Sequence, residues 1–139
     1  MAGRVRPVDM ITLGVIVAAW AVSLSMPVFT YGYPPHRVFD GWIVLTSGYF
    51  HLLVFEFSWL ANFLILTGLA TFLVVSKPAK LLRYHAFAML WCFVSALANV
   101  IFTGFFEWSA VHAGFWLWEA VVLVCGAWFY NLSRQVLLA

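Results

Sequence analysis

The chain has 139 residues, of which 65% are hydrophobic and only 9% carry a charge. Soluble domains usually have about 25% charged residues, so water is not the main solvent for this sequence. Seven basic residues against five acidic ones give a net charge of +2, which is too small and too scattered to indicate a nucleic-acid-binding surface. The composition predicts an all-α, polytopic membrane protein that forms a single domain over residues 1–139.

The first half contains two long apolar runs separated by a turn-rich segment. The first run predicts a transmembrane helix over residues 9–29. Pro34 and Pro35 cannot continue this helix, and the run is longer than the apolar part of a signal peptide. The second run covers residues 42–75, whereas one crossing needs about 20 residues. We therefore expect the second transmembrane helix at about 55–76 and an outer interfacial or re-entrant half-helix at about 41–54.

Two further transmembrane helices are predicted at about 83–105 and 110–133, which gives four crossings in total. Basic residues near the ends of crossings mark the cytoplasmic side of a membrane. If the N-terminus is inside, Arg37 is the one basic residue in an outer loop, and the inner segments hold Arg4, Arg6, Lys77, Lys80, Arg83 and Arg134. The sequence therefore predicts a multi-pass protein of the bacterial cytoplasmic (inner) membrane with both termini in the cytoplasm.

A pattern in the first half resembles one that recurs in small bacterial four-helix inner-membrane proteins. It consists of Ser23-Leu-Ser-Met-Pro-Val-Phe29, then Gly41-Trp42, Leu45 and Gly48, and finally Phe57-Ser-Trp-Leu-Ala-Asn62. The resemblance implies a small inner-membrane protein and supplies no activity. Those proteins often place Pro directly after the Asn, whereas this chain has Phe63 there. Because Asn as an N-cap followed by Pro would start a helix, a helix break near Asn62 is the alternative to a continuous second crossing.

Glu119 is the most informative polar residue in the predicted spans. An ionisable side chain inside a membrane is costly and usually faces the interior of the helix bundle. Counting residues from the helix ends places Ser23, Asn62 and Asn99 at about the same depth as Glu119, below the outer face. This polar layer either forms interhelical hydrogen bonds, or includes a proton-carrying or ligand-binding carboxyl group, or brings Glu119 to a basic residue of a partner protein.

A second group of polar residues is expected at the outer surface, and its members are His36, Asp40, His51, Glu56, Glu107 and His112. His51, His112 and Glu56 are candidate metal ligands, and the two histidines are also suited to hold a haem between helices. Their spacing matches no metal-binding motif, so the alternative is a set of interfacial side chains in contact with water. No cofactor is predicted, with haem or quinone kept as the alternative. His85 is expected at the opposite interface.

Ala88, Cys92 and Ala96 form a seam of small residues at helical spacing in the third predicted crossing. Small residues let helix backbones approach closely, so the seam fits packing within the bundle or against another chain. An aromatic stripe near the start of the fourth crossing is expected to face lipid or to pack, and it consists of Trp108, Phe115, Trp116 and Trp118.

The sequence contains no Gly-rich phosphate loop, no Gly-x-Ser-x-Gly elbow and no His-Glu-x-x-His helix. We therefore lean against an enzyme and expect a small non-enzymatic tetraspan subunit or accessory protein, which packs against itself or a larger membrane complex. Its expected partners are the lipid bilayer and a second copy or membrane-protein complex, and no nucleic acid. One alternative is a small oligomeric proton- or ion-coupled transporter or channel that uses Glu119. The other is a haem or quinone membrane anchor.

Overall fold

The computed structural model describes residues 6–31, 37–47, 57–75, 78–102 and 111–138. This part of the chain is mostly helical and includes one two-stranded antiparallel sheet. In chain order the elements are α1 Pro7–Leu24, β1 Pro27–Tyr31, β2 Arg37–Asp40, α2 Gly41–Ser47, the 3₁₀ turn η2 Ser58–Leu60, α3 Ala61–Val74, α4 Ala79–Phe102 and α5 Ala113–Leu138.

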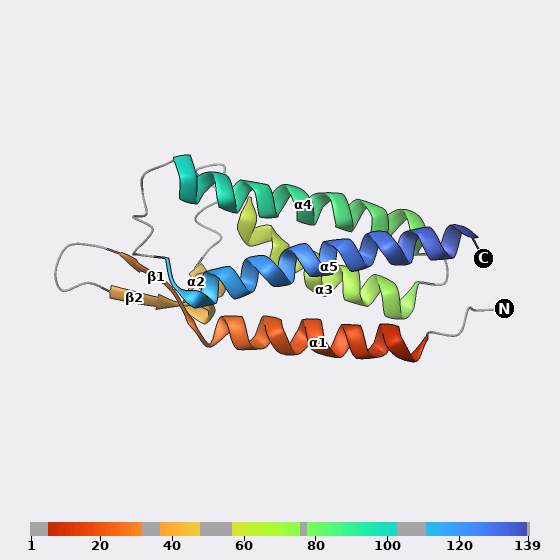
Figure 1. The fold of residues 1–139 in the computed structure, drawn as a ribbon, viewed down its shortest axis with the longest axis horizontal. Coiled ribbons are helices and arrows are strands. Elements are labelled where there is room, and N and C mark those ends of the chain that lie inside the picture. Colours follow the sequence, from red (N-terminus) through yellow and green to blue (C-terminus); the bar gives the residue numbers. More distant parts are fainter. Residues whose placement is uncertain (1–5, 32–36, 48–56, 76–77, 103–110, 139) are drawn as a thin grey trace.

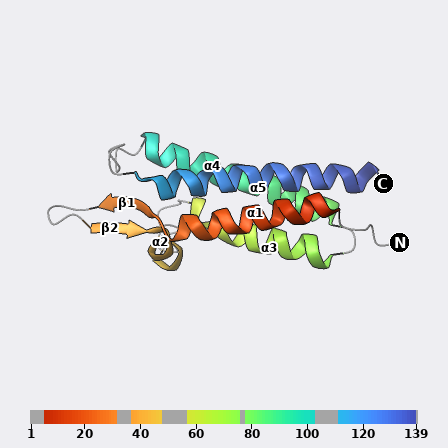
Figure 2. The same ribbon diagram turned by 60° about the horizontal axis from the view of Figure 1, so that its bottom comes forward.

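The helices α1, α3, α4 and α5 lie side by side with their axes roughly aligned, as the two views in Figure 1 and Figure 2 show. The start of α1 and the end of α5 lie at the same end of the bundle, and the β1–β2 hairpin with α2 lies at the opposite end. α5 packs most extensively against α4 and also against α1, whereas α3 packs mainly against α4. α5 is therefore the central helix of the bundle.

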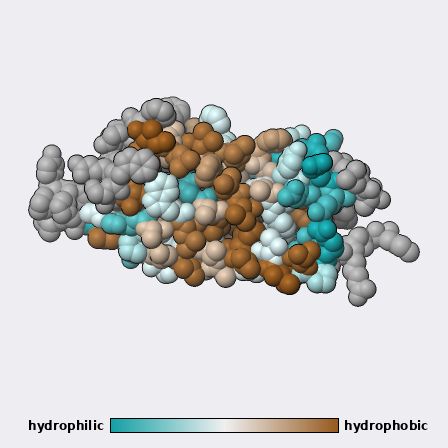
Figure 3. Space-filling model, viewed as in Figure 1, coloured by the Kyte–Doolittle hydropathy of each residue, from teal (hydrophilic) through white to brown (hydrophobic). Residues whose placement is uncertain are grey.

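Three helices among the described residues are long and apolar enough to cross a membrane, over Pro7–Leu24, Ala79–Ile101 and Ala113–Gln135. Figure 3 shows hydrophobic side chains across the middle of the bundle and hydrophilic ones gathered toward the end where α1 begins and α5 ends. Large apolar side chains such as Ile11, Val15 and Trp91 are more than 60% exposed. Such a surface is suited to hydrocarbon, and the chain is a multi-pass membrane protein.

The fourth apolar helix is shorter, because η2 and α3 together cover only Ser58–Val74. Their combined rise is about 27 Å, against about 30 Å for the hydrocarbon core of a bilayer. The α-helix begins at Ala61, one residue before Asn62. A helix break near Asn62 is the alternative that the sequence allows, and the structure has a change from 3₁₀ to α geometry at this place.

The hairpin corrects the expectation of an all-α chain. The helix predicted to reach residue 29 ends at Leu24, and Pro27 then opens β1, because proline has no N–H to donate to a helical hydrogen bond. β1 pairs with β2, and on its other side Phe29 forms a bridge with Val111. β1 therefore connects the segment that begins at Val111 and leads into α5 to the end of α1.

The remaining helix boundaries differ from the predicted ones by a few residues. α4 begins at Ala79 rather than at 83, and α5 runs from Ala113 to Leu138 rather than from 110 to 133. Of the half-helix expected at 41–54, the structure has α2 over Gly41–Ser47, and residues 48–54 are outside the described part. Gly41 is needed at the start of α2, because a Cβ atom there would lie 2.6 Å from the carbonyl oxygen of Ser23.

The main core lies between α1, α3, α4 and α5, and its fully buried side chains include Ile65, Leu82, Met89, Val122 and Phe129. A second cluster joins the hairpin to the adjoining ends of α4 and α5, and it consists of Val28, Ala96, Val100, Val111 and Phe115. The buried polar residues described below lie within this apolar framework, so each of them needs a hydrogen-bonding or charged partner.

Candidate functional site

Asn62 joins three helices through one side-chain amide. Its Oδ1 accepts hydrogen bonds from the indole Nε1 of Trp20 on α1, at 2.9 Å, and of Trp118 on α5, at 3.0 Å. Its Nδ2 donates to the backbone carbonyl of Trp59 in η2 at 3.2 Å. An amide oxygen has two lone pairs, so the two indoles use its full accepting capacity. We call these four residues the Asn62 node.

The Asn62 node forms where η2 passes into α3. A further indole hydrogen bond holds this junction against α2, because Nε1 of Trp59 donates to the carbonyl of Leu45 at 2.9 Å. Leu45 lies in the last turn of α2, where helix carbonyls have no partner within the helix. The sequence predicted a polar role for Asn62 but not these indole donors, because Trp118 belonged to a stripe expected to face lipid or to pack.

The other members of the predicted polar layer take different positions. Glu119 and Ser23 are buried, with exposed fractions of 2% and 1%, and Asn99 on α4 is half-buried. Oγ of Ser23 donates to the carbonyl of Trp20 within α1, so Ser23 does not bond to another helix through this hydroxyl. Glu119 follows Trp118 in α5 and thus adjoins the Asn62 node along the chain.

Of the predicted outer ligands, His112 is in the described part of the chain, and His51 and Glu56 fall outside it. His112 connects the start of the C-terminal segment to β1. Its Nε2 is 2.7 Å from Oγ1 of Thr30, and its backbone N–H donates to the carbonyl of Val28 at 2.8 Å. Among the described residues, no group of three His, Cys, Asp or Glu side chains is placed to hold a metal ion.

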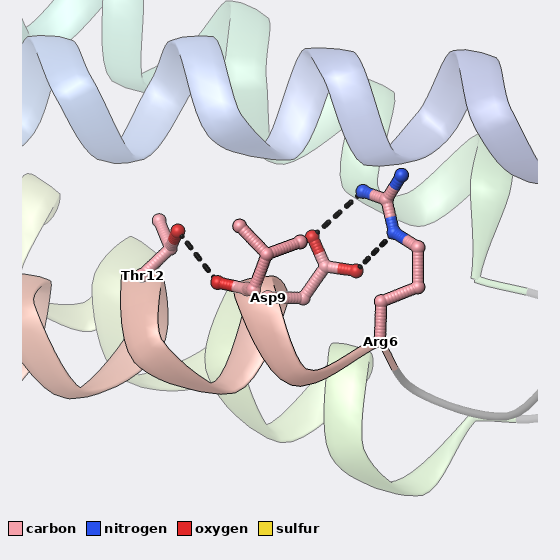
Figure 4. A network of polar contacts seen from close by, with 4 residues as sticks. Arg6, Asp9 and Thr12 are labelled. Carbon is pink, nitrogen blue, oxygen red and sulfur yellow. Dashed lines mark hydrogen bonds and ion pairs between the residues drawn. The ribbon is translucent and has the colours of Figure 1, made fainter.

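At the start of α1, Arg6 and Asp9 form an ion pair in which both carboxylate oxygens of Asp9 take part (Figure 4). Nε of Arg6 donates to Oδ2 of Asp9 at 2.8 Å, and Nη2 donates to Oδ1 at 2.9 Å. Asp9 is only 6% exposed, and its charge also suits the first turn of a helix. The hydrogen bond raises the pKa of Arg6 above its usual value, so this arginine stays charged.

His85 is half-buried near the start of α4 and bonds to a neighbouring helix. Its Nε2 is 3.0 Å from Oγ1 of Thr67 on α3, and its Nδ1 is 2.8 Å from the carbonyl oxygen of Leu81. Because a carbonyl oxygen can only accept, Nδ1 carries a proton in this arrangement. His85 therefore ties α4 to α3, as the Asn62 node ties α3 to α1 and α5.

The small-residue seam of α4 is largely used within this chain. Cys92 and Ala96 are 2% and 3% exposed, and Sγ of Cys92 donates to the carbonyl of Phe57 at 3.4 Å. Ala88, together with Cys92, lines an open apolar groove of about 370 Å³ between α4 and the η2–α3 segment, and Phe63 and Trp91 are among the other lining residues. Of the two expected roles, packing within the bundle applies to Cys92 and Ala96.

Comparison of this chain with protein-family models, with curated proteins and with solved structures found no match. The resemblance seen in residues 23–62 therefore stays a prediction. The functional argument rests on the contacts described above.

Proposed function

We propose that this chain is a non-enzymatic membrane subunit or accessory protein that crosses the bilayer four times and packs against a second copy of itself or a larger membrane complex. Three long apolar helices support the membrane location. The fourth crossing is assigned to η2 and α3. A helix that is short by about 3 Å is accommodated by local thinning of the bilayer, which costs fractions of a kcal/mol per Å.

We assign the cytoplasmic side to the end of the bundle where α1 begins and α5 ends. At this end Arg6 directly precedes α1, Lys80 and Arg83 lie near the start of α4, and Arg134 lies near the end of α5. Clustered basic residues favour the cytoplasmic side. The hairpin, with Arg37 in β2, then faces outward. This orientation is the one that the loop charges predict.

The observation that carries the functional proposal is where three buried or half-buried polar side chains direct their hydrogen bonds. Asn62, His85 and His112 each bond to a different segment of the same chain. The described groove between α3 and α4 is lined by apolar side chains and one thiol. Catalytic sites need polar groups that converge on a substrate position, whereas these groups stabilise the bundle. Such an arrangement suits a packing subunit.

Native mass spectrometry of the protein released from mild detergent tests this proposal. We expect assemblies heavier than the 15.7 kDa chain, and a strictly monomeric protein without a partner would count against the proposal. The topology is tested separately, by single-cysteine labelling from each side of sealed membrane vesicles. Gln135→Cys should react from the cytoplasmic side and Val38→Cys from the outside. The unsubstituted chain is the control, because Cys92 and Cys125 are buried.

A second candidate function is proton-coupled transport through Glu119. This carboxyl group is 2% exposed on α5, the central helix and a candidate span, and ionisable residues in such positions often mark proton or ion pathways. In proteoliposomes, Glu119→Gln should abolish proton-coupled flux, since an amide cannot carry the proton. Ser133→Ala, a buried polar substitution on the same helix, should retain it. Equal flux in both variants would remove the transport hypothesis.

A further inference from the structure

The open groove between α4 and the η2–α3 segment is the feature that the proposed function leaves unexplained. Its volume is about 370 Å³, near the lower end of the range of about 300–1,000 Å³ that small-molecule sites occupy. Ala88 and Cys92 form the α4 side of this groove, and they lie near the middle of α4. The groove therefore lies at a depth where the surrounding medium is hydrocarbon.

The groove lies where the chain enters the fourth apolar helix, and Phe57 and Leu60 of this entry are among its lining residues. The chain enters this helix through Phe57 and the single 3₁₀ turn η2, so α3 begins only at Ala61. Cys92 fixes Phe57 against α4 through the 3.4 Å hydrogen bond to its carbonyl. Ala88 and Cys92, two small side chains of α4, face this segment across the groove.

The chemistry of the walls limits what can occupy the groove. Besides Cys92, the lining side chains in the described part of the chain are aromatic or aliphatic, and the Cys92 thiol already donates to Phe57. A quinone ring or a peptide would bring several polar atoms, whereas the indole N–H of Trp91 is the one further donor among the described lining side chains. Each polar atom left without a partner costs free energy in an apolar site. The occupant must therefore be hydrocarbon along the length that enters the groove.

The shape of the groove distinguishes a lipid chain from a helix of a partner. Packed helices meet along rows of side chains that extend over several turns, at interaxial distances of about 8–10 Å. Here the bulky rings of Phe63 and Trp91 line the groove, and the exposed fractions of these two residues are 49% and 64%. They leave room for a narrow flexible chain but obstruct the close approach of a helix backbone.

We propose that this groove binds one acyl chain of a membrane phospholipid, which completes the packing between α3 and α4. This inference rests on the bundle being embedded in a bilayer and is independent of whether the protein assembles with a partner. The bound chain contacts Leu64 and Ala88 on the two sides of the groove. It fills the space with dispersion contacts that an empty groove would lose.

Photo-crosslinking of the full chain in phosphatidylethanolamine and phosphatidylglycerol vesicles tests the proposal. The probe is a phospholipid with a diazirine midway along one acyl chain, and the labelled peptides are identified by mass spectrometry. We expect labelling concentrated in residues 57–64 and 88–92, and competition by unlabelled phospholipid. Labelling spread evenly over these peptides and the exposed face of α1 would overturn the proposal, as would protection by a prenylated quinone alone.

Ala88→Trp should fill the groove and lower this labelling about tenfold, as the loss of about two methylene contacts would do. The matched control is Ala70→Trp, which adds the same side chain at an exposed α3 position outside the groove lining. Phe63→Ala is a second test, because this half-exposed ring can be removed without opening the core, and it should also lower labelling. Undiminished labelling in Ala88→Trp and Phe63→Ala would contradict the proposal.

Discussion

Replacing Asn62 by Leu should lower the free energy of unfolding by about 2–4 kcal/mol, although the two side chains are similar in size. The substitution leaves the indole N–H groups of Trp20 and Trp118 without their common acceptor, and each unsatisfied buried donor costs about 1–3 kcal/mol. Interhelical bonds in membranes are at the lower end of this range. Reversible unfolding in mixed detergent and SDS micelles, followed by circular dichroism, measures the loss.

A double-mutant cycle separates the hydrogen bonds of the Asn62 node from general packing. Trp20→Phe should destabilise the chain with Asn62 present, because it removes one of the two donors. In the Asn62→Leu background the same change should cost much less, since the acceptor is already gone. Trp118→Phe should behave in the same way. Purely additive losses would show that the node does not couple α1 and α5 to α3.

Substituting Gly68 by Ala should destabilise the bundle by about 1–3 kcal/mol, the usual cost of overpacking a core. A methyl group on Gly68 would overlap the ring of Phe129. That ring is 0% exposed, so it cannot move aside without disturbing its neighbours. At Gly68 the short helix α3 is therefore in close contact with the central helix α5. The same unfolding measurement reports the loss.

Two other glycines are matched controls for this effect. Gly14 on α1 has open space where its Cβ would lie, so Gly14→Ala should stabilise the helix by up to about 1 kcal/mol through helix propensity alone. Gly126 on α5 would bring its Cβ to 3.4 Å from Met89, an ordinary contact, and Gly126→Ala should be close to neutral. In the Gly68→Ala chain, Phe129→Leu should recover part of the lost stability. No recovery would contradict the overlap argument.

The apolar runs determined which segments become long helices. A segment surrounded by hydrocarbon must satisfy its own backbone N–H and C=O groups, and a helix does this within one segment. Hydropathy alone therefore located each end of α1, α4 and α5 to within five residues. The strand pair was missed because β1 and β2 are only five and four residues long. Their pairing depends on the distant Val111 as well as on each other.

The sequence also determined which buried side chains need partners, because Asn62, Glu119 and Ser23 are polar residues in apolar runs. Only the tertiary structure decided which partners they receive. The rotation of α1 and α5 about their axes brings Trp20 and Trp118 to the same oxygen of Asn62, and composition does not encode that rotation.

The crossings show the same division between sequence and structure. Hydrophobicity set the number of apolar segments, since the hydrophobic effect depends on composition and not on partners. The length of the second segment allowed several placements in the bilayer. Packing decided which part of this segment forms α3, because Gly68 contacts Phe129 and the Asn62 node lies at the start of α3. The sequence by itself thus determined a multi-pass chain of long apolar helices, while contacts between distant residues decided the short fourth helix and the groove beside it.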